Sequence, residues 1–311
     1  MIEGQEGVTW DDWVRIAGLV EDKGLEGLYR SDHYTAIIRE DADALDAWTT
    51  LAGLAALTDR IRLGTMVSPA TFRHPSLLAR MAVTVDHISH GRLDVGMGAG
   101  WYEREHLANG FPFLDARRRF DLFAEQVEVV VKSWTEDAFM HDGVAYTLDG
   151  QTALPRPYQS PHPRLVLGGT VRPRFAALAA RYASEVNTLG ASNDELRERK
   201  KRLDSACADV GRDPATLGYS VMTTSFVGAD EREALDRIKM FEAARGTDGD
   251  PATLLAERRD RWLAGTVEEV AERIEELRAV GVTRVLLQHL NHGDDEMIAL
   301  VGDRLVSAVA A

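Results

Sequence analysis

The order of apolar segments along the chain constrains the fold more than any other feature. Short β-like runs alternate with amphipathic helical stretches, and the strands are expected at residues 25–30, 61–67, 93–97, 164–168, 185–188, 217–226 and 282–289. Each of these runs is followed by apolar residues at helical spacing. Because parallel neighbours in a sheet need a crossover connection, the alternation predicts a mostly parallel sheet covered by helices.

Seven such units, without a repeated dinucleotide-binding half, predict an α/β fold of the (β/α)₈ TIM-barrel type. The eighth strand should precede the first helix, which is expected at residues 11–23, but only Met1 to Glu3 is available there. A three-residue strand would leave open ladder groups on both of its neighbours. We therefore expect a truncated first strand and a natural start upstream of Met1.

The segment 139–163 interrupts the alternation with two glycines, four prolines and short β-like pieces. We expect it to be an insertion over one end of the barrel. A barrel of this kind accommodates 311 residues in one unit, so the chain is predicted to be a single domain over 1–311.

Charge and cysteine content exclude several classes of function. The chain has 36 Lys and Arg against 50 Asp and Glu, a net charge of −14, which does not favour binding to nucleic acid or to an anionic membrane. Cys207 is the only cysteine, so an internal disulfide and a thiolate zinc cluster are excluded. The first thirty residues are acidic and lack a long apolar stretch, so we expect a cytoplasmic protein.

In a barrel of this type, ligand-binding groups lie on the loops after the strands. The first predicted strand is followed by Asp32 and His33. Histidine donates or accepts a proton near neutral pH, and a neighbouring carboxylate can orient it or raise its pKa. The alternative is an Asp that caps a helix beside a surface His.

The third strand contains Gly96, Gly98 and Gly100 and is followed by Trp101. Alternate glycines let a ligand approach the backbone closely. The run is not a dinucleotide fingerprint, because Trp101 occupies the place of the last glycine in G-x-G-x-x-G. Trp101 could equally be a core residue.

The fourth strand passes through Gly168, Gly169 and Thr170 into a helix start. Free amides and the helix dipole at such a turn suit a phosphate, and Arg172 and Arg174 would supply positive charge. The alternative is a tight turn with two solvated arginines.

After the last strand come His289, His292, Asp294 and Asp295, which are residue types that bind metals. No H-E-x-x-H, G-x-S-x-G or Walker motif occurs in the chain. We expect no metal site.

Taken in order, the strand ends resemble those of the luciferase-like family of flavin and deazaflavin oxidoreductases, and the likeness covers nearly the whole chain. It rests on Ser31-Asp32-His33, GTMVSPATFRHP from Gly64 to Pro75, GMGAGWYERE from Gly96 to Glu105, and Leu167-Gly168-Gly169. The GAGW run followed by Glu105, together with TFRHP, is similar to the branch that uses the deazaflavin coenzyme F420.

The resemblance implies a barrel with the cofactor ring over its C-terminal mouth and a non-prolyl cis peptide, here Thr65-Met66, behind the ring. It implies that the cofactor lies against Asp32, His33, Thr65, Met66, Val67, Ala99, Gly100, Trp101, Gly168, Gly169, Thr170, Thr188 and Gly190. It also implies a homodimer.

The predicted function is hydride transfer between F420 and a small organic substrate, with His33 as the acid-base residue and Glu105 as the second catalytic candidate. Relatives that oxidise sugar phosphates carry a glutamate where this chain has Trp101, so that reaction is not expected. Two alternatives stay open. One is an FMN-dependent monooxygenase that receives reduced flavin from a separate reductase, and the other is a carrier that binds a flavin or deazaflavin without turnover.

Overall fold

The computed structural model describes residues 1–39, 42–152 and 154–310, and its centre is a parallel sheet. The strand order is β1 (Gly27–Arg30), β2 (Arg62–Thr65), β4 (Leu93–Gly98), β7 (Arg164–Gly168), β8 (Glu185–Leu189) and β9 (Gly218–Gly228), with β11 (Arg284–Gln288) beside β9. The two-residue β3 (Ser68–Pro69) pairs with β4. All seven predicted strands are present, and the predicted parallel α/β sheet is confirmed.

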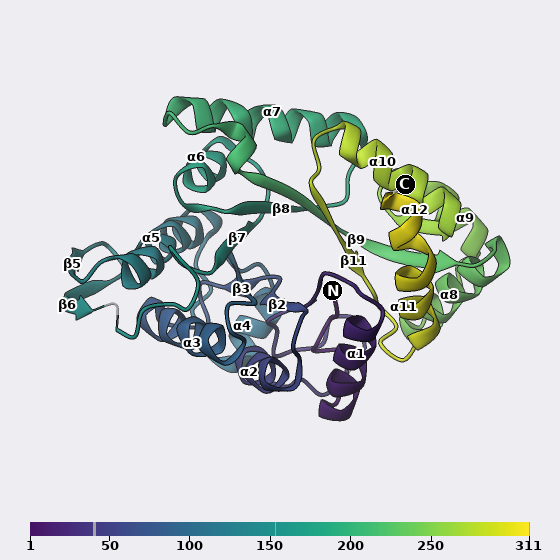
Figure 1. The fold of residues 1–311 in the computed structure, drawn as a ribbon, viewed down its shortest axis with the longest axis horizontal. Helices are drawn as coiled ribbons and strands as arrows, with labels where there is room; N and C mark the ends of the chain where they lie inside the picture. Colours follow the sequence, from purple (N-terminus) through teal and green to yellow (C-terminus); the bar gives the residue numbers. More distant parts are fainter. Residues whose placement is uncertain (40–41, 153, 311) are drawn as a thin grey trace.

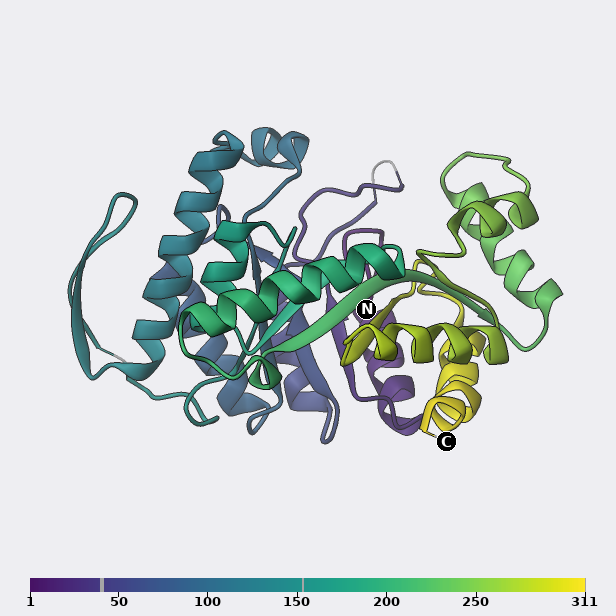
Figure 2. The ribbon, with the colours of Figure 1, turned by 90° about the horizontal axis from the view of Figure 1, so that it is seen from above.

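Helices surround the sheet, as Figures 1 and 2 show. The longer ones are α1 (Trp10–Asp22), α2 (Ala47–Leu57), α3 (Pro75–Ile88), α5 (Ala116–Thr135), α6 (Pro173–Tyr182), α7 (Asn193–Asp209), α8 (Glu231–Ala244) and α10 (Val267–Ala279). The shorter ones are α4 (Glu103–Asn109), a 3₁₀ turn (Pro214–Thr216), α9 (Pro251–Arg258), α11 (Asp295–Leu300), a π-helical turn (Val301–Leu305) and α12 (Val306–Ala310). Within the described ranges, no helix is long and apolar enough to cross a bilayer.

The first helix shows how local sequence sets these elements. Thr9 and Asp12 form a reciprocal capping box at its start, which satisfies main-chain N–H groups that have no partner inside the helix. Its apolar face is buried as the spacing predicts, and Trp13 is fully enclosed. Helix α2 starts in a similar way, because the Asp46 side chain accepts from Thr49 N.

The eighth position of the barrel is held by two residues only. The amide of Ile2 donates to Tyr29 O and its carbonyl accepts from Ser31 N, while Met1 bonds in the same way to Leu287 and His289. Ile2 thereby bridges the ends of β1 and β11 in parallel. The ring of strands is closed at its C-terminal rim and open below it.

Two regions differ from the sequence predictions. The segment predicted to cover a barrel end forms a hairpin of β5 (Ala138–Asp142) and β6 (Thr147–Thr152), which extends sideways beyond α5 in Figure 1. It packs on α5 and α3, where Gln151 bonds to Ser133 and Ser76. The other is β10 (Leu263–Thr266), which the sequence analysis missed because it is four residues long and follows a helix instead of a clear apolar run. It pairs with the far half of β9.

Candidate active site

A cavity of about 510 Å³ lies at the carboxyl ends of the strands. Nine of the predicted site residues line it: His33, Met66, Val67, Gly100, Trp101, Gly168, Gly169, Thr170 and Thr188. They follow five different strands, and the parallel sheet brings all five strand ends to one rim. The structure therefore places these nine predicted residues around a single cavity.

Five predicted residues do not line this cavity, namely Asp32, Thr65, Ala99, Glu105 and Gly190. Thr65 exchanges hydrogen bonds with Gly96, and Ala99 packs on the main core. At Gly190 the backbone of another segment approaches closely, since an added Cβ would lie 2.4 Å from Arg261 O. For these three residues, contact with a cofactor stays a prediction. Asp32 and Glu105 stand one layer behind the cavity wall.

His33 and Glu105 form a buried pair at the edge of the cavity. Glu105 is fully buried, and its Oε2 lies 2.8 Å from His33 Nδ1. Its Oε1 accepts from the main-chain N–H groups of Tyr34 and of Thr35, the latter at 3.0 Å. Because helix α4 carries Glu105 and the loop after β1 carries His33, the carboxylate also fixes the loop.

This pairing sets the charge of His33. Burial disfavours the protonated ring, but the hydrogen bond that Nδ1 donates to Glu105 and the negative charge of Glu105 outweigh burial and raise the pKa of His33 above its ordinary value. With Nδ1 held by Glu105, Nε2 is the ring nitrogen left for chemistry. Trp101 lies edge-on to the ring, with centroids 6.0 Å apart, and is 62% exposed. The geometry suits an acid-base group facing a cavity with an aromatic wall.

Asp32, in the loop after β1, forms a second buried ion pair, with Arg73. Its Oδ2 accepts from Arg73 and from Ser68 Oγ, both at 2.6 Å. Arg73 also bonds to Tyr34 OH and to Asp46, so one guanidinium ties three places on the rim together. Asp32 Oδ1 is buried without a hydrogen-bond partner among the described residues. Asp32 is therefore a supporting residue behind the cavity wall.

The floor of the cavity is Val67, and glycines make room for it. A Cβ at Gly98 or Gly168 would lie 2.6 or 2.8 Å from the Val67 side chain, and one at Gly96 would lie 2.0 Å from Thr65 O. Two of the three alternate glycines thus accommodate the neighbouring strand, and only Gly100 lines the cavity. The cis peptide joins Met66 and Val67, one bond later than the predicted Thr65-Met66.

The turn after β7 differs in detail from the predicted phosphate site. The Gly169 N–H donates to Asn187 O, so it is not a free amide. Arg174 pairs with Asp121 on the surface, and neither it nor Arg172 lines the cavity. Arg199 on α7 does line it, beside Thr170 and Thr188. The positive charge comes from a helix that the sequence analysis did not connect with the site.

The N-terminal segment supplies residues that the sequence analysis missed. Glu6 is buried, and its two oxygens accept from the main-chain N–H groups of Ile37, Ile38 and Arg39 at 2.7 to 3.0 Å. It lines the cavity together with Glu3 and Gln5. The only sequence signal was the polar stretch before the first helix, in the place where a strand was expected.

The histidines and aspartates after the last strand serve other purposes. Asp294 caps α11 and pairs with Arg237, and Asp295 pairs with Arg15. His289 is buried below the rim. In the part of the chain that the structure describes, no three metal-ligating side chains gather.

The fold is that of a known enzyme family. The family model for luciferase-like monooxygenases matches residues 2–284, and the chain belongs to that family. It is a family of oxidoreductases and monooxygenases.

Relatives of this chain use two different cofactors. An FMNH₂-dependent dimethylsulfone monooxygenase of Pseudomonas putida is 25% identical over 94% of this chain and 86% of its own length. An F420-dependent glucose-6-phosphate dehydrogenase of Microbacterium testaceum is 23% identical over 93% and 90%. The structure of an F420-dependent secondary alcohol dehydrogenase superposes with a TM-score of 0.82, at 20% identity over 99% of this chain and 97% of that one, which shows a shared fold.

Proposed function

We propose that this protein is an F420-dependent oxidoreductase that transfers a hydride between the deazaflavin and a small organic substrate. The observation that carries the proposal is the His33–Glu105 pair at the cavity edge, because hydride transfer from an alcohol or to a carbonyl needs a group that takes the proton from, or gives it to, the substrate oxygen. The resemblance of GAGW, Glu105 and TFRHP to the F420 branch supports this choice of cofactor.

The cavity lining fits such a cofactor. Met66, Val67 and Trp101 offer apolar and aromatic surface for a flat ring, while Thr170, Asn187, Thr188 and Arg199 offer hydroxyl, amide and guanidinium groups for a phosphate-bearing tail. When bound, the deazaflavin supplies the centre that gives or takes the hydride.

The chain's own residues supply the proton and the geometry. In the oxidation direction, His33 Nε2 takes the proton that leaves the substrate hydroxyl; in the reduction direction, it returns that proton. Glu105 holds the ring by Nδ1 and stabilises its protonated form. Arg73 and Asp32 keep the loop that carries His33 in place, and Met66 and Val67 add apolar surface to the cavity wall.

A kinetic experiment tests the role of His33. The purified protein is mixed with F420 and a panel of alcohols, or with reduced F420 and the matching carbonyl compounds, and cofactor absorbance is followed. His33→Asn keeps a side chain that can donate to Glu105 but cannot exchange the proton, so turnover should fall by about 10² or more. An unchanged rate would remove His33 from the mechanism.

An FMN-dependent monooxygenase is the second candidate, and the Pseudomonas relative favours it. It would require reduced flavin from a separate reductase, oxygen consumption and an oxygenated product. The carrier alternative requires binding without any substrate-dependent change in cofactor absorbance. The same assay, run with both cofactors and an oxygen electrode, separates the three.

We also propose a homodimer, in line with the family resemblance. Light scattering of the purified protein should give twice the chain mass of 34.3 kDa, whereas the mass of a single chain would contradict this.

A further inference from the structure

The rim cavity has a second polar end, which lies across the ring of strands from Thr170. Glu3 and Gln5 reach it from the segment between β1 and β11, and Gln288 reaches it from the end of β11. We call these three residues the acidic end. His33 follows the neighbouring strand β1, so the acidic end adjoins the acid-base residue of the cavity.

Two amides hold the carboxylate of Glu3 in the acidic end. Gln288 Nε2 donates to its Oε1 at 2.6 Å, and Gln5 Nε2 donates to its Oε2 at 3.0 Å. The amide oxygens have other partners, because Ser31 Oγ donates to Gln5 Oε1. In the same way, Thr224 Oγ1 donates to Gln288 Oε1. Both amides therefore direct N–H groups at Glu3, whose remaining lone pairs are left for a further donor.

The negative charge of Glu3 has no counter-charge in the protein. Among residues 1–39, 42–152 and 154–310, no cationic nitrogen lies within 4 Å of its carboxylate oxygens. By contrast, Glu105 is paired with His33, and the oxygens of Glu6 accept from three main-chain N–H groups. A fixed carboxylate that is left uncompensated in a cavity wall attracts a cation with N–H donors.

Arg199 and Glu3 give the cavity two ends of opposite charge. In the described part of the chain, the Arg199 guanidinium likewise has no carboxylate within 4 Å. Burial lowers the pKa of His33, and the charge of Glu3 acts together with Glu105 to raise it. Glu3 therefore lies within electrostatic reach of the acid-base residue, on the side of the cavity away from the proposed phosphate-binding groups.

We propose that the acidic end binds an ammonium group of the substrate, and that the substrate is an amino alcohol or the corresponding amino ketone. With the hydroxyl at His33 Nε2, the ammonium supplies the counter-charge that Glu3 lacks. A carboxylate or phosphate in the same place would meet a like charge. The substrate class rests on the proposed function, whereas the binding of a cation at Glu3 does not.

The reaction is the one already proposed. The C–H bond of the carbinol carbon breaks with both of its electrons, which leave as a hydride to the oxidised cofactor. The O–H proton goes to His33 Nε2, and an amino ketone remains. The ammonium group takes no part in the bond changes, so Glu3 is a specificity-determining residue and not an acid or base.

A matched series of ligands tests the proposal. The compounds 1-amino-2-propanol, 1,2-propanediol and 3-hydroxybutyrate share one secondary alcohol and differ in a terminal ammonium, hydroxyl or carboxylate. Titration calorimetry of the purified protein at pH 7 gives the Kd of each compound without any turnover. The amino alcohol should bind at least about tenfold more tightly than the diol, and the hydroxy acid most weakly.

Two variants locate the charge that produces this preference. Glu3→Gln keeps the shape of the side chain and removes its charge, so the preference for the amino alcohol over the diol should fall to about twofold or less. The control Glu231→Gln makes the same change in net charge at an exposed position on α8 and should keep the preference. Equal binding of amino alcohol and diol by the wild type, binding of neither, or a preference that survives in Glu3→Gln would overturn the proposal.

Turnover of the same series with F420 separates this proposal from the proposed function. Oxidation of the amino alcohol with the highest kcat/KM would support both. Oxidation of all three compounds with equal kcat/KM would support the proposed function and overturn the substrate class. Tight binding of the amino alcohol without oxidation of any compound would support the cation site and overturn the hydride-transfer role and, with it, the substrate class.

Discussion

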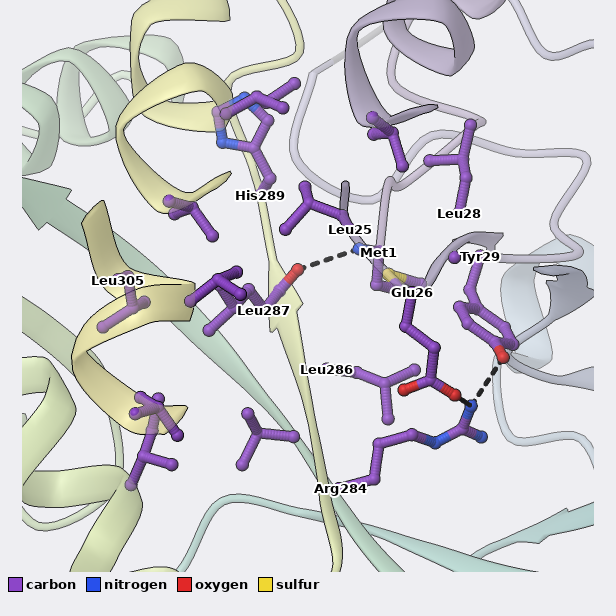
Figure 3. A pocket seen from close by; sticks show the side chains of 18 of the residues that line it. Met1, Leu25, Glu26, Leu28, Tyr29, Arg284, Leu286, Leu287, His289 and Leu305 are labelled. Atoms are coloured by element: carbon purple, nitrogen blue, oxygen red, sulfur yellow. Dashed lines mark hydrogen bonds and ion pairs between the residues drawn. The ribbon is translucent and has the colours of Figure 1, made fainter. Parts of the chain in front are cut away.

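The rim of the barrel and a groove below it are adjacent, but different forces organise them. At the rim, buried charges occur in pairs: Glu105 with His33, and Asp32 with Arg73. The groove, a cavity of about 410 Å³ between β1 and β11 (Figure 3), has mostly apolar walls, although Glu26, Arg278 and Arg284 also line it. Burial lowers the pKa of the Met1 amino group and of the His289 ring there. The rim therefore holds charge in buried pairs, whereas burial in the groove disfavours the charged forms of these two groups.

We expect the largest loss of stability from a substitution that breaks the Asp32–Arg73 pair at the rim. Arg73→Met leaves the Asp32 carboxylate buried without its counter-charge, and should lower the free energy of unfolding by about 3–5 kcal/mol. The measurement is urea denaturation at pH 7. The double variant Asp32→Asn/Arg73→Met should recover most of the loss, and a double variant as unstable as the single one would contradict the pairing account.

The groove should respond to pH in the opposite way from the His33–Glu105 pair, in which the pKa of the histidine is raised. Burial lowers the pKa of His289 to about 4, and its Nε2 has no hydrogen-bond partner among the described residues. The unfolded chain takes up this proton near pH 6.5, so stability falls as the pH drops from about 6.5 to 4, by on the order of 3 kcal/mol.

His289→Leu should remove this part of the pH dependence, as measured by the free energy of unfolding at pH 7 and pH 4. The control is His87→Leu, which changes an exposed histidine on α3 and should leave the dependence as it is. If the pH dependence of both variants equals that of the wild type, the folded protein binds a proton at His289 as readily as the unfolded chain does. That result would show that water reaches His289 in the groove.

Arg199 places a positive charge in the wall of the rim cavity and does not line the groove. Arg199→Met should weaken binding of a phosphate-bearing cofactor about tenfold or more, because it removes a charged hydrogen-bond donor beside Thr170 and Thr188. The matched control is Arg197→Met on the same helix, whose side chain pairs with Asp194 on the surface. Equal weakening in both variants would assign the effect to net charge instead of contact.

The smallest effect is a shift of the activity profile. Glu105→Gln preserves the shape of the side chain but removes the charge that raises the pKa of His33, so the limb of the pH–rate profile that reports His33 should move to lower pH. Glu103→Gln, at an exposed position on α4, should leave the profile in place. A shift to higher pH would contradict the assigned sign.

The strands and the rim were predictable because both depend on local pattern. Apolar runs between helices located the parallel sheet. The segments after these runs, together with the family resemblance that they carry, named nine residues that line the cavity. The missed residues come from distant segments. Arg199 reaches the cavity from α7, and Glu6 holds the loop at Ile37 to Arg39 through main-chain contacts that leave no sequence pattern. Gly96 and Gly98 were predicted to let a ligand approach the backbone, but the groups that approach them are Thr65 O and the Val67 side chain.

The central claim is that the rim cavity binds a deazaflavin. The most direct measurement is a side-by-side titration with F420 and FMN, followed by tryptophan fluorescence, with Trp101→Phe as the variant that loses the reporter at the cavity wall. The account predicts F420 binding at least about tenfold tighter than FMN, with a quench that shrinks in the variant. Tighter binding of FMN, or no binding of either cofactor, would contradict it.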